Sequence, residues 1–356
     1  MRHSVTQKAP CAATSLTLMT RKPNRPWTKE SLLELSRSYQ AAAIIGAAAD
    51  LDLFSSVAPA PASAADLARR LRCQPRGLTI LLDALVALRL LAKSGDHYRL
   101  PSIVGDHLTP EGPQTVLAMA QHQANCLRLW VQLAQVVKTG RPARRIPSVR
   151  GEAGDKESFI GAMDNIAAPN ADHVIRAIRP LLFRKLLDVG GASGTWALAF
   201  LRACPAAEAT IFDLPHVIPM ARRRLAAARM QRRVRLVAGD FMKDPLPPGA
   251  DLAWVSAIVH QNSRAQNREL FAKVFQALVP GGRIAIRDIL MEANHTQPVA
   301  GALFAVNMLV ATQGGGTFTF AELREDMAAA GFIGAAIMRR DKAMNAVVIA
   351  QKPGAE

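Results

Sequence analysis

One segment, residues 186–195 with the sequence LLDVGGASGT, constrains the fold more than any other part of this 356-residue chain. Its apolar first half predicts a strand, its glycines predict a sharp turn, and Thr195 is expected to begin a helix. Further along, residues 209–212 predict a second strand that ends on Asp213. A glycine turn followed by an acid at the tip of the next strand is typical of α/β sheets that bind a nucleoside, because the carboxylate can accept hydrogen bonds from ribose hydroxyls.

The glycine spacing also excludes a first interpretation. It is not the G-x-G-x-x-G of dinucleotide-binding proteins, so a nicotinamide or flavin dinucleotide is not the expected ligand. From Lys185 onward, predicted strands and helices alternate, which indicates a parallel sheet covered by helices on both faces. In such sheets ligands bind beyond the carboxyl ends of the strands. The predicted strands are residues 185–189, 209–212, 234–238, 251–256, 283–288, 335–339 and 346–350.

The N-terminal part is predicted to be helical. Residues 1–27 look like a basic leader without the apolar core of a secretion signal. Within a domain predicted over residues 28–150, Ser63 caps a short helix, Pro75 opens a second, and Gly95 lies in a tight turn between two short strands, a winged-helix-like pattern. A long helix over 114–137, a linker over 140–155 and a helix over 157–166 are expected next, the last leading into a domain over 151–356.

The formal net charge of +16 suggests nucleic acid or a membrane surface as a partner. The second helix of the winged-helix pattern, however, carries only Arg76, Thr79 and the acidic Asp83 among apolar residues, whereas groove reading needs exposed Arg, Lys, Asn or Gln. We therefore expect this domain to pack or dimerise. No apolar run is long enough for a transmembrane helix, and the four scattered cysteines favour a cytoplasmic protein without a metal site.

Six short motifs carry a family resemblance. Together they resemble the S-adenosylmethionine (SAM)-dependent O-methyltransferases that act on small molecules, over roughly residues 28–352. The resemblance implies a Rossmann-like doubly wound sheet, an all-helical, winged-helix-like dimerisation domain, SAM as cofactor, and a homodimer that methylates a hydroxyl of an aromatic or polyketide-like molecule. The motifs are DVGGASG (188–194), FDLP (212–215), GDF (239–241), His260, LVPGGR (278–283) and NML (307–309).

The resemblance also assigns cofactor-binding roles. Gly190 and Gly191 would lie against the methionine part of SAM, and Asp213 would hold the ribose. Asp240 would accept a hydrogen bond from the adenine amine, and Phe241 would stack on its ring. Taken on their own, the residues also allow Asp240 to cap a turn and Phe241 to pack in the core. The expected cofactor set is Gly190, Gly191, Asp213, Leu214, Asp240, Phe241 and Ser256.

His260 matches the general base of the family, which takes the proton from the substrate hydroxyl. An imidazole suits this role because it is largely neutral at pH 7 and can accept a proton. A polar pocket residue in a methylation driven by alignment alone, or a structural histidine, are the alternatives. The family positions that line the acceptor site are Phe159, Met163, Phe304, Asn307 and Met308, with Asn307 as an orienting hydrogen-bond partner.

Three positions depart from the family pattern. Ala192 replaces a glycine, Gln261 replaces an acid after the base, and Arg287 stands where many relatives carry a glutamate that supports the histidine, with Asp288 next to it. An arginine would lower the proton affinity of a nearby histidine. A C- or N-methyltransferase, or a relative that does not methylate, therefore stays open. A nucleic-acid methyltransferase is less favoured, because residues 256–260 read SAIVH where adenine-N6 enzymes carry an Asn/Asp-Pro-Pro-aromatic tetrad.

Overall fold

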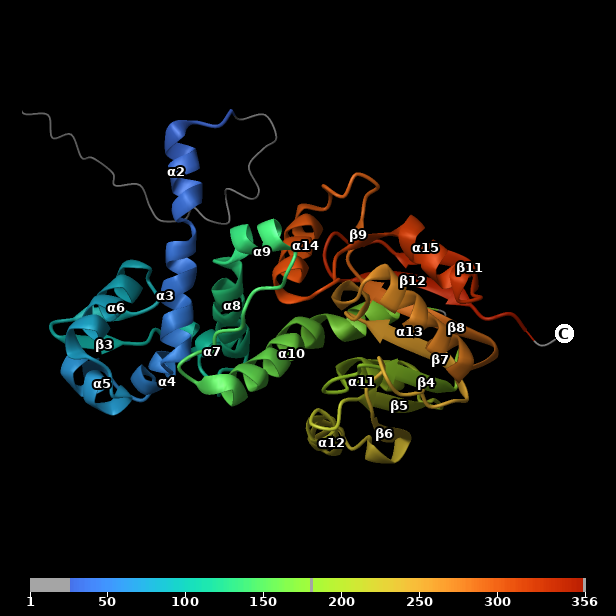
Figure 1. Cartoon of the computed structure of the whole chain (residues 1–356). Coiled ribbons are helices and arrows are strands. Elements are labelled where there is room, and N and C mark those ends of the chain that lie inside the picture. The colour runs from blue at the N-terminus through green and yellow to red at the C-terminus, as the bar shows by residue number, and fades with distance from the viewer. Residues whose placement is uncertain (1–25, 180–181, 355–356) are drawn as a thin grey trace, which may run out of the picture. The chain divides into compact units, whose positions relative to one another are not determined.

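A computed structural model describes residues 26–179 and 182–354, so all but the last two residues of the predicted leader lie outside the described residues. The described chain forms two compact units (Figure 1). One comprises residues 26–127 with Pro147–Ala162 and is helical; the other comprises Arg128–Ile146 with the residues from Met163 onward and contains the large sheet. The sequence prediction placed a single boundary after residue 150, whereas the chain passes between the units three times.

The first unit contains the helix–turn–helix and hairpin that the sequence predicts. The Ser63 side chain caps the first of these helices by accepting the Asp66 N–H, and the second helix begins at Pro75. The two hairpin strands pair antiparallel around Gly95. The elements are α2 (Lys29–Arg37), α3 (Tyr39–Asp50), α4 (Leu53–Val57), β1 (Ala62–Ser63), α5 (Ala64–Leu71), α6 (Pro75–Ala87), β2 (Ala92–Ser94), β3 (His97–Arg99), α7 (Ser102–Leu108) and α8 (Leu117–Trp130).

Two helix predictions after residue 114 were wrong. The expected helix over 114–137 is broken into α8 and α9 (Leu133–Thr139). At the break, the Gln132 side chain donates to the carbonyls of Arg128 and Arg144 and accepts the Arg144 N–H at 3.0 Å, which fixes the chain in a turn. The expected helix over 157–166 is much longer, since α10 runs over Gly151–Ala177 and begins inside the predicted linker.

The second unit is built on a seven-stranded sheet with all seven predicted strands. Its strand order is β11-β12-β8-β7-β4-β5-β6. The strands from β8 to β6 are parallel, and β12 pairs antiparallel with both of its neighbours, β8 and β11. The strand order reverses between β4 and β7, and in sheets of this kind ligands bind at the carboxyl ends of the strands beside such a reversal. The strands are β4 (Lys185–Val189), β5 (Glu208–Asp213), β6 (Val234–Ala238), β7 (Ala250–Ser256), β8 (Leu278–Asp288), β11 (Ile333–Arg339) and β12 (Ala346–Gln351).

Both faces of this sheet are buried, because side chains along each strand point alternately to opposite faces. On one face Leu187 and Val189 pack with α13 (Arg264–Ala277) and α15 (Phe320–Ala329). On the other face Leu186 packs with α10 and α11 (Thr195–Ala203). The sheet is thus held as a rigid layer whose carboxyl edge can position a site. In the described ranges, no helix is both long enough and apolar enough to cross a membrane.

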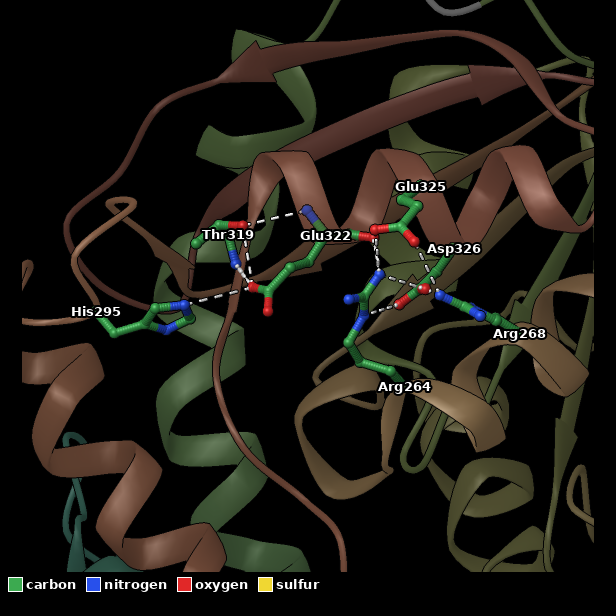
Figure 2. Close-up of polar contacts among 7 residues, drawn as sticks. All are labelled: Arg264, Arg268, His295, Thr319, Glu322, Glu325 and Asp326. Atoms are coloured by element: carbon green, nitrogen blue, oxygen red, sulfur yellow. Dashed lines mark hydrogen bonds and ion pairs between the residues drawn. The ribbon is translucent and has the colours of Figure 1, made fainter.

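A buried ion-pair cluster joins α13 to α15 (Figure 2). Asp326 is fully buried and accepts hydrogen bonds from Arg264 Nε at 2.9 Å and Arg268 Nε at 2.6 Å. Glu325 pairs with the same two arginines but lies largely in solvent. Buried charges are stabilising only while they stay paired. The helix pair beside the sheet therefore depends on Asp326 and much less on Glu325.

We expect Asp326→Ala to lower the free energy of unfolding by about 2 kcal/mol, because two partly exposed arginines lose their charge-assisted hydrogen bonds to a buried carboxylate. The matched control is Glu325→Ala, which removes an exposed partner of the same arginines and should cost less than about 1 kcal/mol. Denaturant unfolding followed by circular dichroism measures both. Equal losses for the two variants would show that the buried carboxylate has no special role.

Candidate functional site

The glycine turn after β4 has the tight geometry that its sequence predicts. Gly190 has a φ of +65°, and its N–H donates to the Phe212 carbonyl at 2.8 Å. A Cβ added at Gly190 would lie 2.6 Å from Ile258 Cδ1, so no larger residue fits there without a shift. Ala192, which replaces the family glycine, has a left-handed φ of +47° that L-residues rarely adopt. The turn therefore keeps its shape despite the substitution, at a cost in backbone strain.

Two carboxylates hold the turn. Asp213 at the tip of β5 is half-buried; its Oδ2 accepts the Ala192 N–H and its Oδ1 the Leu214 N–H, both at 2.7 Å. Burial raises the pKa of Asp213, and these two donors offset part of that rise. Burial likewise raises the pKa of Asp188 to about 7, opposed by the N–H of Ala197 in the first turn of α11. Asp213 is thus already oriented by the turn that precedes it.

A polar network that the sequence analysis missed supports the same turn. Asp164 on α10 accepts the Thr195 hydroxyl at 2.8 Å and forms an ion pair with Arg224 on α12 (Ile218–Ala227). Arg224 also donates to the Ser193 hydroxyl at 3.1 Å. In the sequence, Asp164 was recognisable only as an acidic residue on a predicted helix. No motif indicated that it lies beside the glycine turn. The network fixes Ser193 and Thr195 at the start of α11.

The expected adenine-binding residues lie at the next strand tip. Phe241 is half-buried beside the turn, since a Cβ at Gly190 would lie 3.7 Å from its ring. Asp240 is half-buried and accepts the Met242 N–H at 2.9 Å, so its carboxylate also caps a turn, as the alternative interpretation held. Ser256 is buried, and its hydroxyl accepts a hydrogen bond from Arg287. Of this group, Phe241 lies beside the glycine turn and Asp240 directly precedes Phe241 in the chain, whereas the Ser256 hydroxyl is already engaged.

His260 and Asp288 form a buried pair. His260 lies in a short 3-10 helix, η2 (Val259–Gln261), just after β7, and Asp288 is the last residue of the adjacent strand β8. His260 Nδ1 lies 2.9 Å from both carboxylate oxygens of Asp288, and both side chains are buried. Because a carboxylate only accepts, Nδ1 carries the hydrogen, and Nε2 is the nitrogen that can take up a proton. This is the arrangement of an oriented general base.

The side chain of β8 that meets His260 comes from Asp288 and not from Arg287. Neighbouring residues on a strand point to opposite faces, so Asp288 meets the histidine and Arg287 points away. Arg287 is buried, donates to Ser256 and Asn345, and lies 4.4 Å from the Trp196 ring. Burial lowers the pKa of Arg287 to about 10. The Gln261 side-chain amide donates a hydrogen bond to the Ala257 carbonyl.

A loop of three glycines after α14 (Val299–Ala311) fixes the backbone at His260. The Gly316 N–H donates to the His260 carbonyl at 2.9 Å. A Cβ added at Gly315 would lie 2.5 Å from the same carbonyl oxygen, closer than any real contact of that kind. The sequence gave no reason to single out this loop. The loop lies so close to η2 that only glycine fits at position 315.

The expected acceptor residues fall on α14 and α10. The Phe304 ring packs edge-on against His260 with centroids 4.8 Å apart, Met308 is buried, and the Asn307 amide accepts the Trp130 indole N–H at 2.9 Å. Met163 belongs to the same unit as these residues. Phe159 belongs to the other unit, where its ring lies 5.3 Å from His122. Among residues 26–179 and 182–354, no cluster of three or more His, Cys, Asp or Glu side chains could hold a metal ion.

Family models match both units. The model of the O-methyltransferase domain matches residues 130–333, and that of the O-methyltransferase dimerisation domain matches residues 33–102. A 3-hydroxy-5-methyl-1-naphthoate 3-O-methyltransferase of Streptomyces sahachiroi is 33% identical over 75% of this chain and 79% of its own length. The tetracenomycin polyketide synthesis 8-O-methyl transferase TcmO of Streptomyces glaucescens is 32% identical over 85% of this chain and 90% of its own.

A solved structure agrees with these matches. The crystal structure of human N-acetylserotonin methyltransferase in complex with SAM superposes with a TM-score of 0.77 and 25% identity, covering 93% of this chain and 99% of that one. The glycine turn, Asp213 and the oriented histidine thus lie in a fold whose relatives use SAM. The chain belongs to the O-methyltransferase family, and it is a SAM-dependent methyltransferase.

Proposed function

We propose that this enzyme transfers the methyl group of SAM to a hydroxyl of a small aromatic or polyketide-like molecule, with His260 as the general base. The observation that carries the proposal is the buried His260–Asp288 pair at the carboxyl edge of the sheet. His260 follows β7, the neighbour of β4 and its glycine turn, and Asp288 ends β8 on the other side of β7. By their names, the two Streptomyces relatives methylate oxygens of a hydroxynaphthoate and of a polyketide.

The residues at the strand tips fit the cofactor. The half-buried Asp213 carboxylate has acceptor capacity beyond its two backbone donors, which suits the ribose hydroxyls. Phe241 and Asp240 offer a ring and a carboxylate for the adenine, and the tight turn at Gly190 and Gly191 would lie against the methionine part. Leu214 would contribute apolar surface. Ser256 would act only through its backbone, since its hydroxyl is bonded to Arg287.

The chemistry divides between cofactor and protein. When bound, SAM supplies a methyl group made electrophilic by its sulfonium. His260 Nε2 accepts the proton of the substrate hydroxyl, while Asp288 keeps the hydrogen on Nδ1 and stabilises the imidazolium that forms. The edge-on Phe304 ring restricts the imidazole from the other side. The protein thereby aligns an oxygen nucleophile and removes its proton.

Cofactor binding is tested by Asp213→Ala. The variant loses an acceptor for two hydroxyls, so SAM should bind about 30-fold more weakly, equivalent to about 2 kcal/mol. The control is Asp251→Ala, which removes a carboxylate that binds the Arg184 and Lys185 N–H groups where β4 begins, at the opposite edge of the sheet. It should leave SAM affinity unchanged. Calorimetry that finds the same affinity for Asp213→Ala and the wild type would refute the assignment.

The base is tested by turnover. His260→Ala should lower kcat by roughly 10²–10⁴-fold with a phenolic acceptor while SAM affinity stays nearly constant. Asp288→Asn, which leaves Nδ1 without its carboxylate, should lower kcat by at least about tenfold. Gln261→Ala is the control, because its side chain bonds only to the preceding turn. If His260→Ala kept a near-wild-type kcat, His260 would not be the base, and catalysis would rest on alignment of the acceptor and the methyl group alone.

We also propose that the chain is a homodimer through its first unit. That unit matches the dimerisation domain of the family, and α2 with the start of α3 exposes Leu32, Leu33, Leu35 and Tyr39, each more than 40% accessible. An apolar face of this kind is typical of obligate interfaces. Leu32→Glu combined with Leu35→Glu should yield monomers in sedimentation equilibrium at micromolar concentration, whereas Ile103→Glu, also exposed, should not. A monomeric wild type would refute the proposal.

A further inference from the structure

One hydrogen bond beside the candidate acceptor site joins residues far apart in sequence. Trp130, the last residue of α8, donates its indole N–H to Oδ1 of Asn307 on α14 at 2.9 Å, across 177 positions of the chain. Both side chains are half-buried. The family resemblance suggested Asn307 as a contact of the acceptor. It did not indicate whether the amide oxygen or the amide NH₂ group faces the acceptor.

The chemistry of the two groups decides that orientation. An indole N–H can only donate, so the amide oxygen of Asn307 has to face Trp130. The oxygen and nitrogen of an isolated amide can exchange places by a rotation. The Trp130 N–H favours only the orientation in which the oxygen faces it. The side of Asn307 turned away from Trp130 is therefore the NH₂ group, a donor and not an acceptor.

The position of Asn307 on α14 shows that this donor lies near the proposed base, which binds the reacting hydroxyl. Asn307 follows Phe304 by three residues on α14, and residues three apart lie on the same side of a helix. The Phe304 ring contacts the His260 imidazole edge-on at 4.8 Å. The Asn307 amide thus lies one helical turn from the ring that touches the base.

We propose that Trp130 is a positioning residue that turns the NH₂ group of Asn307 toward the acceptor. The enzyme thereby selects acceptors that carry an oxygen able to accept a hydrogen bond, a carbonyl or carboxylate, on the same ring system as the methylated hydroxyl. This inference rests on the proposed transfer to a hydroxyl. It adds a requirement on the acceptor that an apolar wall and a general base alone would not impose.

The test compares acceptors that differ in one oxygen. Isomeric hydroxyacetonaphthones are paired with the ethylnaphthols of the same substitution, which have nearly the same size but no carbonyl. The wild type should favour the best ketone over its ethyl partner by at least about tenfold in kcat/KM, because an ethyl group would cover the Asn307 donor and leave it unpaired. In Trp130→Phe, which keeps a ring but removes the N–H, this ratio should fall toward one. Val131→Ala, a change at a neighbouring residue that is 73% exposed, should keep the wild-type ratio.

A second variant guards against a folding defect. Asn307→Asp keeps an oxygen for Trp130 but has no N–H to offer, so the preference for the ketone should disappear while calorimetry shows SAM affinity unchanged. A preference that survives in both Trp130→Phe and Asn307→Asp, or a wild-type ratio near one, would overturn the inference and leave the proposed function standing. Failure of the wild type to methylate either member of any pair would refute both.

Discussion

Burial of both faces of the seven-stranded sheet is the constraint on which the site depends. Because Leu187 and Val189 of β4 face α13 and α15, the neighbouring Leu186 faces α10 and α11. The same alternation continues along β8 to its last residue, Asp288. That register sends Arg287 to the Trp196 side and Asp288 to His260. A slip of one residue would exchange the cation and the anion beside His260, so the apolar core also determines which charge meets the histidine.

The elements that the sequence predicted well are those with strong local signals. Short apolar runs with glycine or acidic ends predicted every strand of the sheet, because parallel strands buried on both faces need continuous apolar sequence. Helix ends between the units were predicted poorly. The break after Trp130 depends on hydrogen bonds between Gln132 and the backbone of Arg144, and no local pattern reports a contact of this kind. The same limit applies to the point where α10 begins.

The site was predictable in part. Residues at strand tips, such as Asp213 and His260, follow from where strands end. The partner of His260 did not follow, because the resemblance pointed to position 287 and only the strand register shows that the neighbouring Asp288 supplies the carboxylate. Asp164 and Trp130 act on residues that lie distant in sequence, and a single chain contains no local signal that pairs them. Contacts between distant elements therefore make up most of what sequence reasoning missed.

The three glycines at 314–316 have a consequence for how this loop can vary. A side chain at Gly314 would meet Ser263 at 2.9 Å, and one at Gly315 would meet the His260 carbonyl, whereas a Cβ at Gly316 has nothing within 4 Å. Mutational tolerance should therefore differ sharply within a run of identical residues. Drift can replace the third glycine by any residue that keeps the N–H bonded to the His260 carbonyl, but a change at the second would displace the His260 backbone without touching its side chain. Homologues in which only Gly316 varies would be functionally equivalent to this chain at this loop.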